Sequence, residues 1–355
     1  MQIVERLSAI ALPCLAAALT LQTSAALAQQ ARIVQTNSQS DTISLIDPAT
    51  QRVVAEVKGV PVNHGAAAAP DGSRLYFSSE AKTTLDVVDG KTLRIIKEIP
   101  LSARPNNITI GKDGRFVYVG IMQGKGGIDV IDTRTLENAA HIDTASRVHN
   151  VYVTPDGKYV VAGAFGGDNN LRVYDTATRQ LAFSLYPPRN PAGGDAMDGI
   201  RPVTIDAKPD GSTRNLYVQL SDFHGFTVVD FATGKEVKRV ELPQVPPDQR
   251  VPEGTYNRAP SHGIGVTPDQ TSLWVCSRLN GHVYGYSLPD LKLIASIPVG
   301  DHPDWITFSP DGRFAYAANG GSDNVSVIDI AARKELTRIP VGKAPKRNIT
   351  AILPP

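Results

Sequence analysis

A short turn signal recurs along the whole chain, and it constrains the fold more than any other feature. One copy is TPDG at 154–157. Related copies are APDG (69–72), GKDG (111–114), KPDG (208–211), TPDQ (267–270), SPDG (309–312) and a terminal LPP (353–355). The second positions of these copies are 42, 43, 54, 59, 42 and 44 residues apart. A repeat of about 42 residues indicates one supersecondary unit per repeat, packed against its neighbours.

Each repeat contains four short runs with the composition of β-strands. HNVYVT (149–154) precedes the turn and KYVVAGA (158–164) follows it, while NNLRVYD (169–175) supplies the third run. KELTRIPVG (334–342) is an example of the fourth. Four strands per repeat, in seven repeats, predict an all-β fold: a seven-bladed β-propeller with four-stranded blades, whose strands are named a to d in order.

The two ends of the mature chain predict how the ring closes. RIVQT (32–36) matches strand b of the other repeats, so the first repeat lacks its own strand a. NITAIL (348–353) matches strand a and has no further strands behind it. We therefore expect the N-terminal strands b, c and d to pair with a C-terminal strand a, which leaves no free sheet edge.

The first 28 residues read as a cleavable export signal. Arg6 precedes an apolar run at 7–21, and ALA at 26–28 is a small-x-small cleavage site. The sequence therefore predicts a signal peptide at 1–28 and one propeller domain at 29–355, in the periplasm or secreted. No later segment is apolar over the length that a bilayer requires, so we expect no membrane span. The expected mature protein is a monomer with one cysteine, Cys276, and hence no internal disulfide.

Charge and motifs exclude several functions. The chain carries 36 basic and 35 acidic residues, a net charge of +1, which shows no overall bias toward nucleic acid or membranes. It also lacks a nucleophile elbow, a haem-attachment motif, a phosphate-binding loop and a dinucleotide fingerprint.

The repeats VYVTPDGKYVVAG (151–163) and SPDGRFAYAANGGSDNVSVIDI (309–330) resemble those of the YVTN-repeat β-propellers, a group that includes the YncE-like proteins. The resemblance extends over essentially the whole mature chain and implies a periplasmic or cell-surface propeller. Relatives include binding proteins and subunits. Neighbouring propeller families include lactonases, lyases and copper or haem enzymes, so the resemblance does not imply one activity.

Aligning the repeats brings two sets of polar residues to the starts of the strands a. Residues separated by two positions lie on the same side of a strand, and strand a lines the channel of a propeller. The outer set is basic and suits a carboxylate or phosphate. We therefore predict an anion-binding site at Arg104, Arg147, Arg201, His302 and Lys346. The inner set, two positions further along, predicts ligands for a divalent transition metal: His64, His149, His262 and Asp304.

Three functions remain open. The leading hypothesis is a protein that binds an anionic small molecule or a partner protein at the channel mouth. The alternative is a metal-dependent enzyme of the lyase, lactonase or copper oxidase type, in which Cu, Zn or Fe is held by the inner set. Binding of single-stranded nucleic acid is the weakest hypothesis, because the charge is balanced and exposed aromatic residues do not cluster. The width of the channel decides whether the histidines can share one ion.

Overall fold

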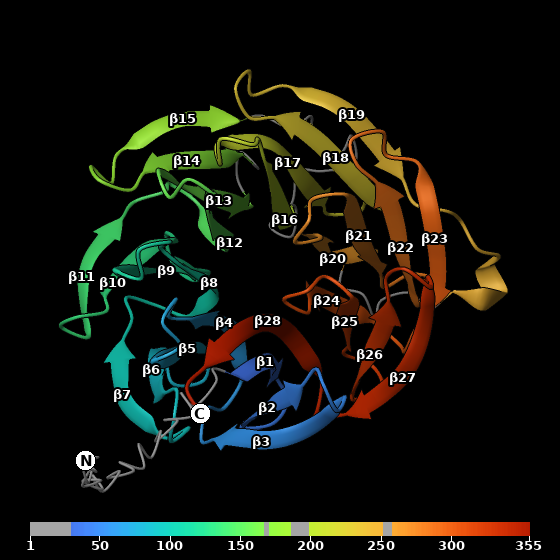
Figure 1. The fold of residues 1–355 in the computed structure, drawn as a ribbon. Helices are drawn as coiled ribbons and strands as arrows, with labels where there is room; N and C mark the ends of the chain where they lie inside the picture. Colours follow the sequence, from blue (N-terminus) through green and yellow to red (C-terminus); the bar gives the residue numbers. More distant parts are fainter. Residues whose placement is uncertain (1–29, 167–169, 186–198, 251–257) are drawn as a thin grey trace, which may run out of the picture.

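Seven antiparallel sheets form a closed ring around a central channel (Figure 1). The computed structural model describes residues 30–166, 170–185, 199–250 and 258–355. In that part of the chain it contains 28 β-strands and one 3-10 turn, Pro247–Gln249. Each sheet has four strands, so the predicted seven-bladed propeller is confirmed. The proposed signal peptide at 1–28 lies outside the described residues and stays a prediction.

The blades follow one another along the chain, each in the order a to d. Blade 1 is β28 (Pro345–Leu353), β1 (Gln30–Asn37), β2 (Thr42–Asp47) and β3 (Arg52–Lys58); blade 2 is β4 (Asn63–Ala68), β5 (Arg74–Ser79), β6 (Thr84–Asp89) and β7 (Ile95–Pro100). Blade 3 is β8 (Pro105–Ile110), β9 (Phe116–Ile121), β10 (Gly127–Asp132) and β11 (Glu137–Ile142); blade 4 is β12 (Arg147–Val153), β13 (Tyr159–Phe165), β14 (Leu171–Asp175) and β15 (Leu181–Leu185). Blade 5 is β16 (Ile200–Ala207), β17 (Thr213–Leu220), β18 (Gly225–Asp230) and β19 (Glu236–Glu241); blade 6 is β20 (Ser261–Val266), β21 (Ser272–Ser277), β22 (His282–Ser287) and β23 (Leu293–Pro298). Blade 7 is β24 (Pro303–Phe308), β25 (Phe314–Asn319), β26 (Asn324–Asp329) and β27 (Lys334–Pro340).

Both ends of the chain meet in blade 1, as predicted. Strand β28 lies beside β1 (Figure 1), where Gln30 pairs with Leu353 and Val34 pairs with Ile349. This pairing seals the ring, because it supplies the one strand a that the N-terminal segment lacks. The edge of β1 that would otherwise expose unpaired backbone groups is thereby covered.

The hydrophobic core lies between the blades. One buried cluster fills each of the seven joints; at the joint of blades 1 and 2, for example, Val34 and Leu45 pack against Phe77. Because apolar side chains leave water only when two neighbouring blades meet, each blade depends on both neighbours for its core. The ring is therefore a rigid frame for the residues that line its channel.

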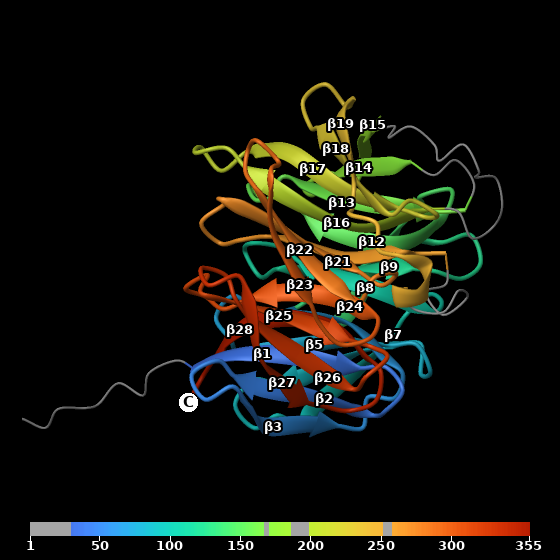
Figure 2. The same cartoon turned by 90° about the vertical axis from the view of Figure 1, so that its right-hand side faces the viewer.

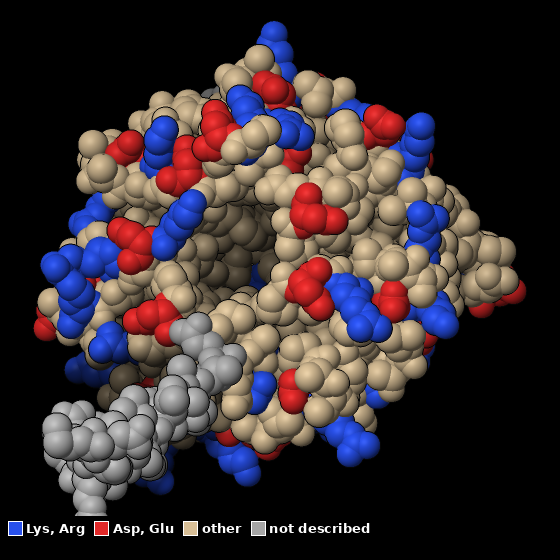
Figure 3. Space-filling model, in the orientation of Figure 1, with Lys and Arg blue, Asp and Glu red and all other residues tan. Residues whose placement is uncertain are grey.

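The recurrent turn joins strands a and b on one face of the ring. Gly157 has a φ of +75°, and the Asp156 carboxylate accepts a hydrogen bond of 3.1 Å from the backbone N–H of Lys158. These are the properties for which Asp and Gly are selected in tight turns. The C-terminus marks this face, which lies on the left in Figure 2 and toward the viewer in Figure 3, where the channel opens as a central hollow.

Within the described residues, no helix has the length and apolar character that crossing a membrane requires.

Candidate functional site

A pocket of about 510 Å³ lies where the strands a begin, at the opposite end of the channel from the face in Figure 3. Every blade contributes to its wall. Its lining includes all nine residues that the sequence singled out: Arg104, Arg147, Arg201, His302, Lys346, His64, His149, His262 and Asp304. Arg278 adds a fifth Lys or Arg side chain, whereas Asp304 supplies the one carboxylate in the described lining. The described part of the pocket wall therefore has an excess of positive charge.

A β-bulge interrupts every strand a at the level of this pocket. In β12, Val148 pairs with Ala164 and Asn150 pairs with Gly163, which leaves His149 as the extra residue. In each of the other six blades, strand a likewise has one residue more than the paired stretch of strand b at this level. A bulge breaks the two-residue alternation and turns a side chain in a new direction. Adjacent residues can therefore both approach the channel, as Lys346 and Arg347 do.

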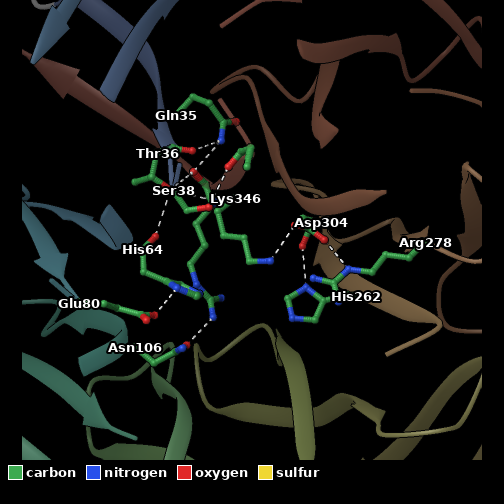
Figure 4. A network of polar contacts seen from close by, with 12 residues as sticks. Gln35, Thr36, Ser38, His64, Glu80, Asn106, His262, Arg278, Asp304 and Lys346 are labelled. Carbon is green, nitrogen blue, oxygen red and sulfur yellow. Dashed lines mark hydrogen bonds and ion pairs between the residues drawn. The ribbon is translucent and has the colours of Figure 1, made fainter. Parts of the chain in front are cut away.

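Asp304 holds two of the cations by ion pairs (Figure 4). Its carboxylate pairs with Arg278 Nε and, at 2.8 Å, with Lys346 Nζ. Burial by itself would raise the pKa of Asp304, but the two cations outweigh burial and hold that pKa below its usual value. The carboxylate is therefore ionised, and it is committed to two partners.

Two buried histidines stand side by side in opposite tautomers. His262 Nδ1–H donates to the backbone carbonyl of Asp304 at 2.7 Å, so its Nε2 carries a lone pair. His149 Nδ1 accepts from the Asn150 side-chain amide, so its Nε2 carries the proton. Burial lowers the pKa of both imidazoles well below the usual value. The two neutral rings, with centroids 5.9 Å apart, offer the pocket one acceptor and one donor.

His64 lies in a separate contact with Glu80. Its Nδ1 is 2.6 Å from Glu80 Oε1, and Arg104 lies 3.7 Å from the other carboxylate oxygen. Burial lowers the pKa of His64 to about 4, although Glu80 favours the charged form. The ring is therefore neutral near pH 7, and within the described part of the chain its buried Nε2 has no partner.

The four predicted metal ligands share the pocket without forming a metal-binding cluster. Over the residues that the structure describes, no three His, Cys, Asp or Glu side chains are grouped so that they could hold one ion. Asp304 is engaged by Arg278 and Lys346, and His64 is engaged by Glu80. A metal at His64, His149, His262 and Asp304 thus finds no support in this geometry and stays a prediction.

Phe165 supports two cations of the outer set. The Arg201 guanidinium lies 4.8 Å and that of Arg147 lies 5.5 Å from the centre of the Phe165 ring. Arg201 also donates from Nε to the Ser221 hydroxyl at 2.9 Å. Cation–π contact and this hydrogen bond orient the two guanidinium groups at the pocket wall.

Sequence reasoning missed three charged residues near the pocket. Arg278 and Glu80 each follow the last residue of a strand b. Aligning the repeats at the ends of the strands b would have identified this shared position. Arg347 is 2% exposed, donates from Nη2 to Asn106 Oδ1 at 2.9 Å, and lies 4.1 Å from the Trp305 ring. Strict alternation assigns Arg347 to the side away from the channel, and the bulge in β28 overturns that assignment.

Comparison with known proteins agrees with the architecture. A family model described as a seven-bladed β-propeller lactonase matches residues 123–342, and one described as a YncE-like β-propeller matches residues 22–186. A search of curated proteins found no match.

Solved structures with this architecture include proteins of different activities. Hydrazine synthase from Kuenenia stuttgartiensis is 26% identical, with a TM-score of 0.67 over 82% of this chain and 90% of its own. The periplasmic gluconolactonase PpgL from Pseudomonas aeruginosa is 21% identical, with a TM-score of 0.68 over 91% and 100%. The dihydro-haem d1 dehydrogenase NirN is 18% identical, with a TM-score of 0.61 over 87% and 63%. The last two similarities show the fold alone.

Proposed function

Because the chain belongs to the seven-bladed β-propeller lactonase family and its residues 22–186 also match a YncE-like β-propeller, we propose that its channel-mouth pocket binds a small organic anion. The observation that carries this proposal is the charge of the pocket wall. Among the described residues that line it, five are Lys or Arg and one carries a carboxylate, and that carboxylate is already paired with two of the five cations. Guanidinium groups held at a concave wall match the planar oxygens of a carboxylate.

The size of the pocket favours a small molecule over a partner protein. Its volume of about 510 Å³ lies within the range of small-molecule sites, roughly 300–1,000 Å³. Its cations come from five different blades, so they converge on one bound molecule. A protein partner would instead engage the wider surface around the mouth.

The periplasm or the exterior of the cell is the proposed location. The export signal read at 1–28 supports it, as do the YncE-like match and the fold shared with a periplasmic gluconolactonase.

Tryptophan fluorescence provides a direct test. Trp305 lies 6.0 Å from His262, ring centre to ring centre, whereas Trp274 is fully buried in a blade joint. We expect gluconate, malonate or inorganic phosphate to change the emission saturably, and uncharged glucose to have no effect. Trp305→Phe should remove the signal while calorimetry still detects binding. Calorimetry that detects none of the three anions with wild-type protein would overturn the proposal.

Lactone hydrolysis is a second candidate, favoured by the pair of neutral histidines. His262 Nε2 can accept a proton from water while that water attacks the carbonyl carbon of a lactone. The ring C–O bond then breaks and the proton passes to the departing alkoxide, which gives a hydroxy acid. The new carboxyl group releases its proton to solvent, and the cations retain the resulting anion. Hydrolysis of glucono-δ-lactone above the spontaneous rate, lost in His262→Ala, would support this activity. Elemental analysis and activity after chelation distinguish it from the metal-dependent enzyme.

A further inference from the structure

Arg347 is a buried cation that has no counter-ion among the residues that the structure describes. Its side chain extends from β28 and is 2% exposed. Of its three nitrogens, Nη2 donates to Asn106 Oδ1, whereas Nε and Nη1 have no hydrogen-bond partner within the described part of the chain. No carboxylate of the described ranges lies within ion-pairing distance of it. A buried charge in this state destabilises a folded protein strongly, which suggests a role other than stability.

Two neighbours hold Arg347 in place, one at its guanidinium and one at its backbone. The Trp305 ring lies 4.1 Å away and provides a cation–π contact. The Thr36 hydroxyl donates to the carbonyl of Arg347 at 3.0 Å, and the N–H of Arg347 donates back to that hydroxyl at 3.0 Å. Side chain and backbone are therefore both fixed before any ligand arrives.

Arg347 also determines how the side chain of Asn106 is oriented. Asn106 lines the pocket, and its Oδ1 accepts the hydrogen bond from Arg347. Since a guanidinium only donates, the oxygen of the amide must face Arg347 and the NH₂ group must face away from it. Among the described residues, none accepts a hydrogen bond from that NH₂ group.

We propose that Asn106 and Arg347 form a deep anion subsite at the floor of the pocket. The Asn106 NH₂ group donates to a carboxylate oxygen of the ligand, and Arg347 behind it supplies positive charge and fixes the amide. Arg347 is thus a positioning residue, and the ligand enters with a carboxylate end first. This inference rests on the proposed function, because it names which group of the anion reaches the floor.

Asn106→Asp is the sharpest test, because it should change stability and affinity in opposite directions. The new carboxylate gives Arg347 the counter-ion that it lacks, so the melting temperature should rise. The same change replaces the ligand's donor by a negative charge, so the affinity for malonate should fall at least about tenfold. A residue with only a structural role would not separate the two measurements in this way.

Asn348→Asp is the matched control. Asn348 occupies the corresponding position of β28, but its amide donates to Gln35 and to the Tyr316 carbonyl, and it is not part of the described pocket lining. This variant should lower the melting temperature and leave malonate affinity within about twofold of wild type. Arg347→Met should weaken malonate binding and raise the pKa of His64 in NMR titrations, because Arg347 opposes protonation of that ring.

The outcomes separate this inference from the proposed function. Wild-type protein that binds malonate while Asn106→Asp binds it equally well overturns the deep subsite alone. A fall in both stability and affinity in Asn106→Asp would also refute it. Wild-type protein that binds none of the probes overturns both proposals, whatever the variants do.

Discussion

Replacing Asp304 by Asn should destabilise the protein more than any single change on its surface. The carboxylate neutralises two cations, and the exposed fractions are 7% for the Asp304 and Arg278 side chains and 25% for Lys346. The amide keeps the shape but leaves both cations without their counter-ion. Breaking a buried ion pair by removing one partner costs about 3–5 kcal/mol, and we expect a loss of that size in the free energy of unfolding.

Urea-induced unfolding, followed by circular dichroism, measures this loss. Asp290→Asn is the control, because the Asp290–Lys292 pair lies on the surface, 61% and 77% exposed, and should contribute less than about 1 kcal/mol. Adding Lys346→Met to Asp304→Asn should restore about 1–3 kcal/mol, because it removes one of the two cations that lose the Asp304 carboxylate. A loss below about 1 kcal/mol in Asp304→Asn, or strictly additive effects in the double variant, would refute the reasoning.

Three further predictions concern acid stability, ring closure and the anchoring of the arginines. The pKa of His64 is about 4 in the folded protein and 6.5 in a free side chain, so the unfolded chain takes up the proton first as pH falls. Stability should therefore decline between about pH 6.5 and 4, and His64→Gln should reduce this decline by about 2–3 kcal/mol in urea titrations at pH 7 and 4.5. Deleting residues 345–355 removes β28, and calorimetry should then detect no cooperative unfolding; a sharp transition would contradict the closure argument. Phe165→Leu should weaken malonate binding about tenfold, because both Arg147 and Arg201 lose their aromatic support, and unchanged affinity would show that the ring does not orient them.

The fold was predictable because short sequence patterns that repeat along the chain determine it. The turn at Thr154–Gly157 needs Asp and Gly because of the backbone conformation and hydrogen bonds of those four residues alone. The runs on either side have the composition of β-strands, which can be recognised within one blade. Counting the repeats then predicted seven blades, and the mismatch of the two ends predicted the pairing of β28 with β1. None of these steps depends on contacts between distant side chains.

The candidate site was predictable only in part. Alignment of the strands a identified nine residues that line one pocket, because structurally equivalent positions converge on the axis of a ring. The proposed division into an outer anion site and an inner metal site did not anticipate that Asp304 pairs with Lys346 and Arg278. That pairing joins residues of blades 1, 6 and 7. The spacing of the sequence repeat does not show which side chains of different blades contact one another.

The sequence by itself therefore determined the architecture, the closure of the ring and the end of the channel at which polar residues gather. Only the tertiary structure decided what those residues do to one another. The bulge in each strand a breaks the alternation on which counting relies, and it brings Arg347 to Asn106 and Trp305. Burial then sets the protonation of the histidines, and burial is a property of the assembled ring, in which each side chain is enclosed by residues far away in the chain.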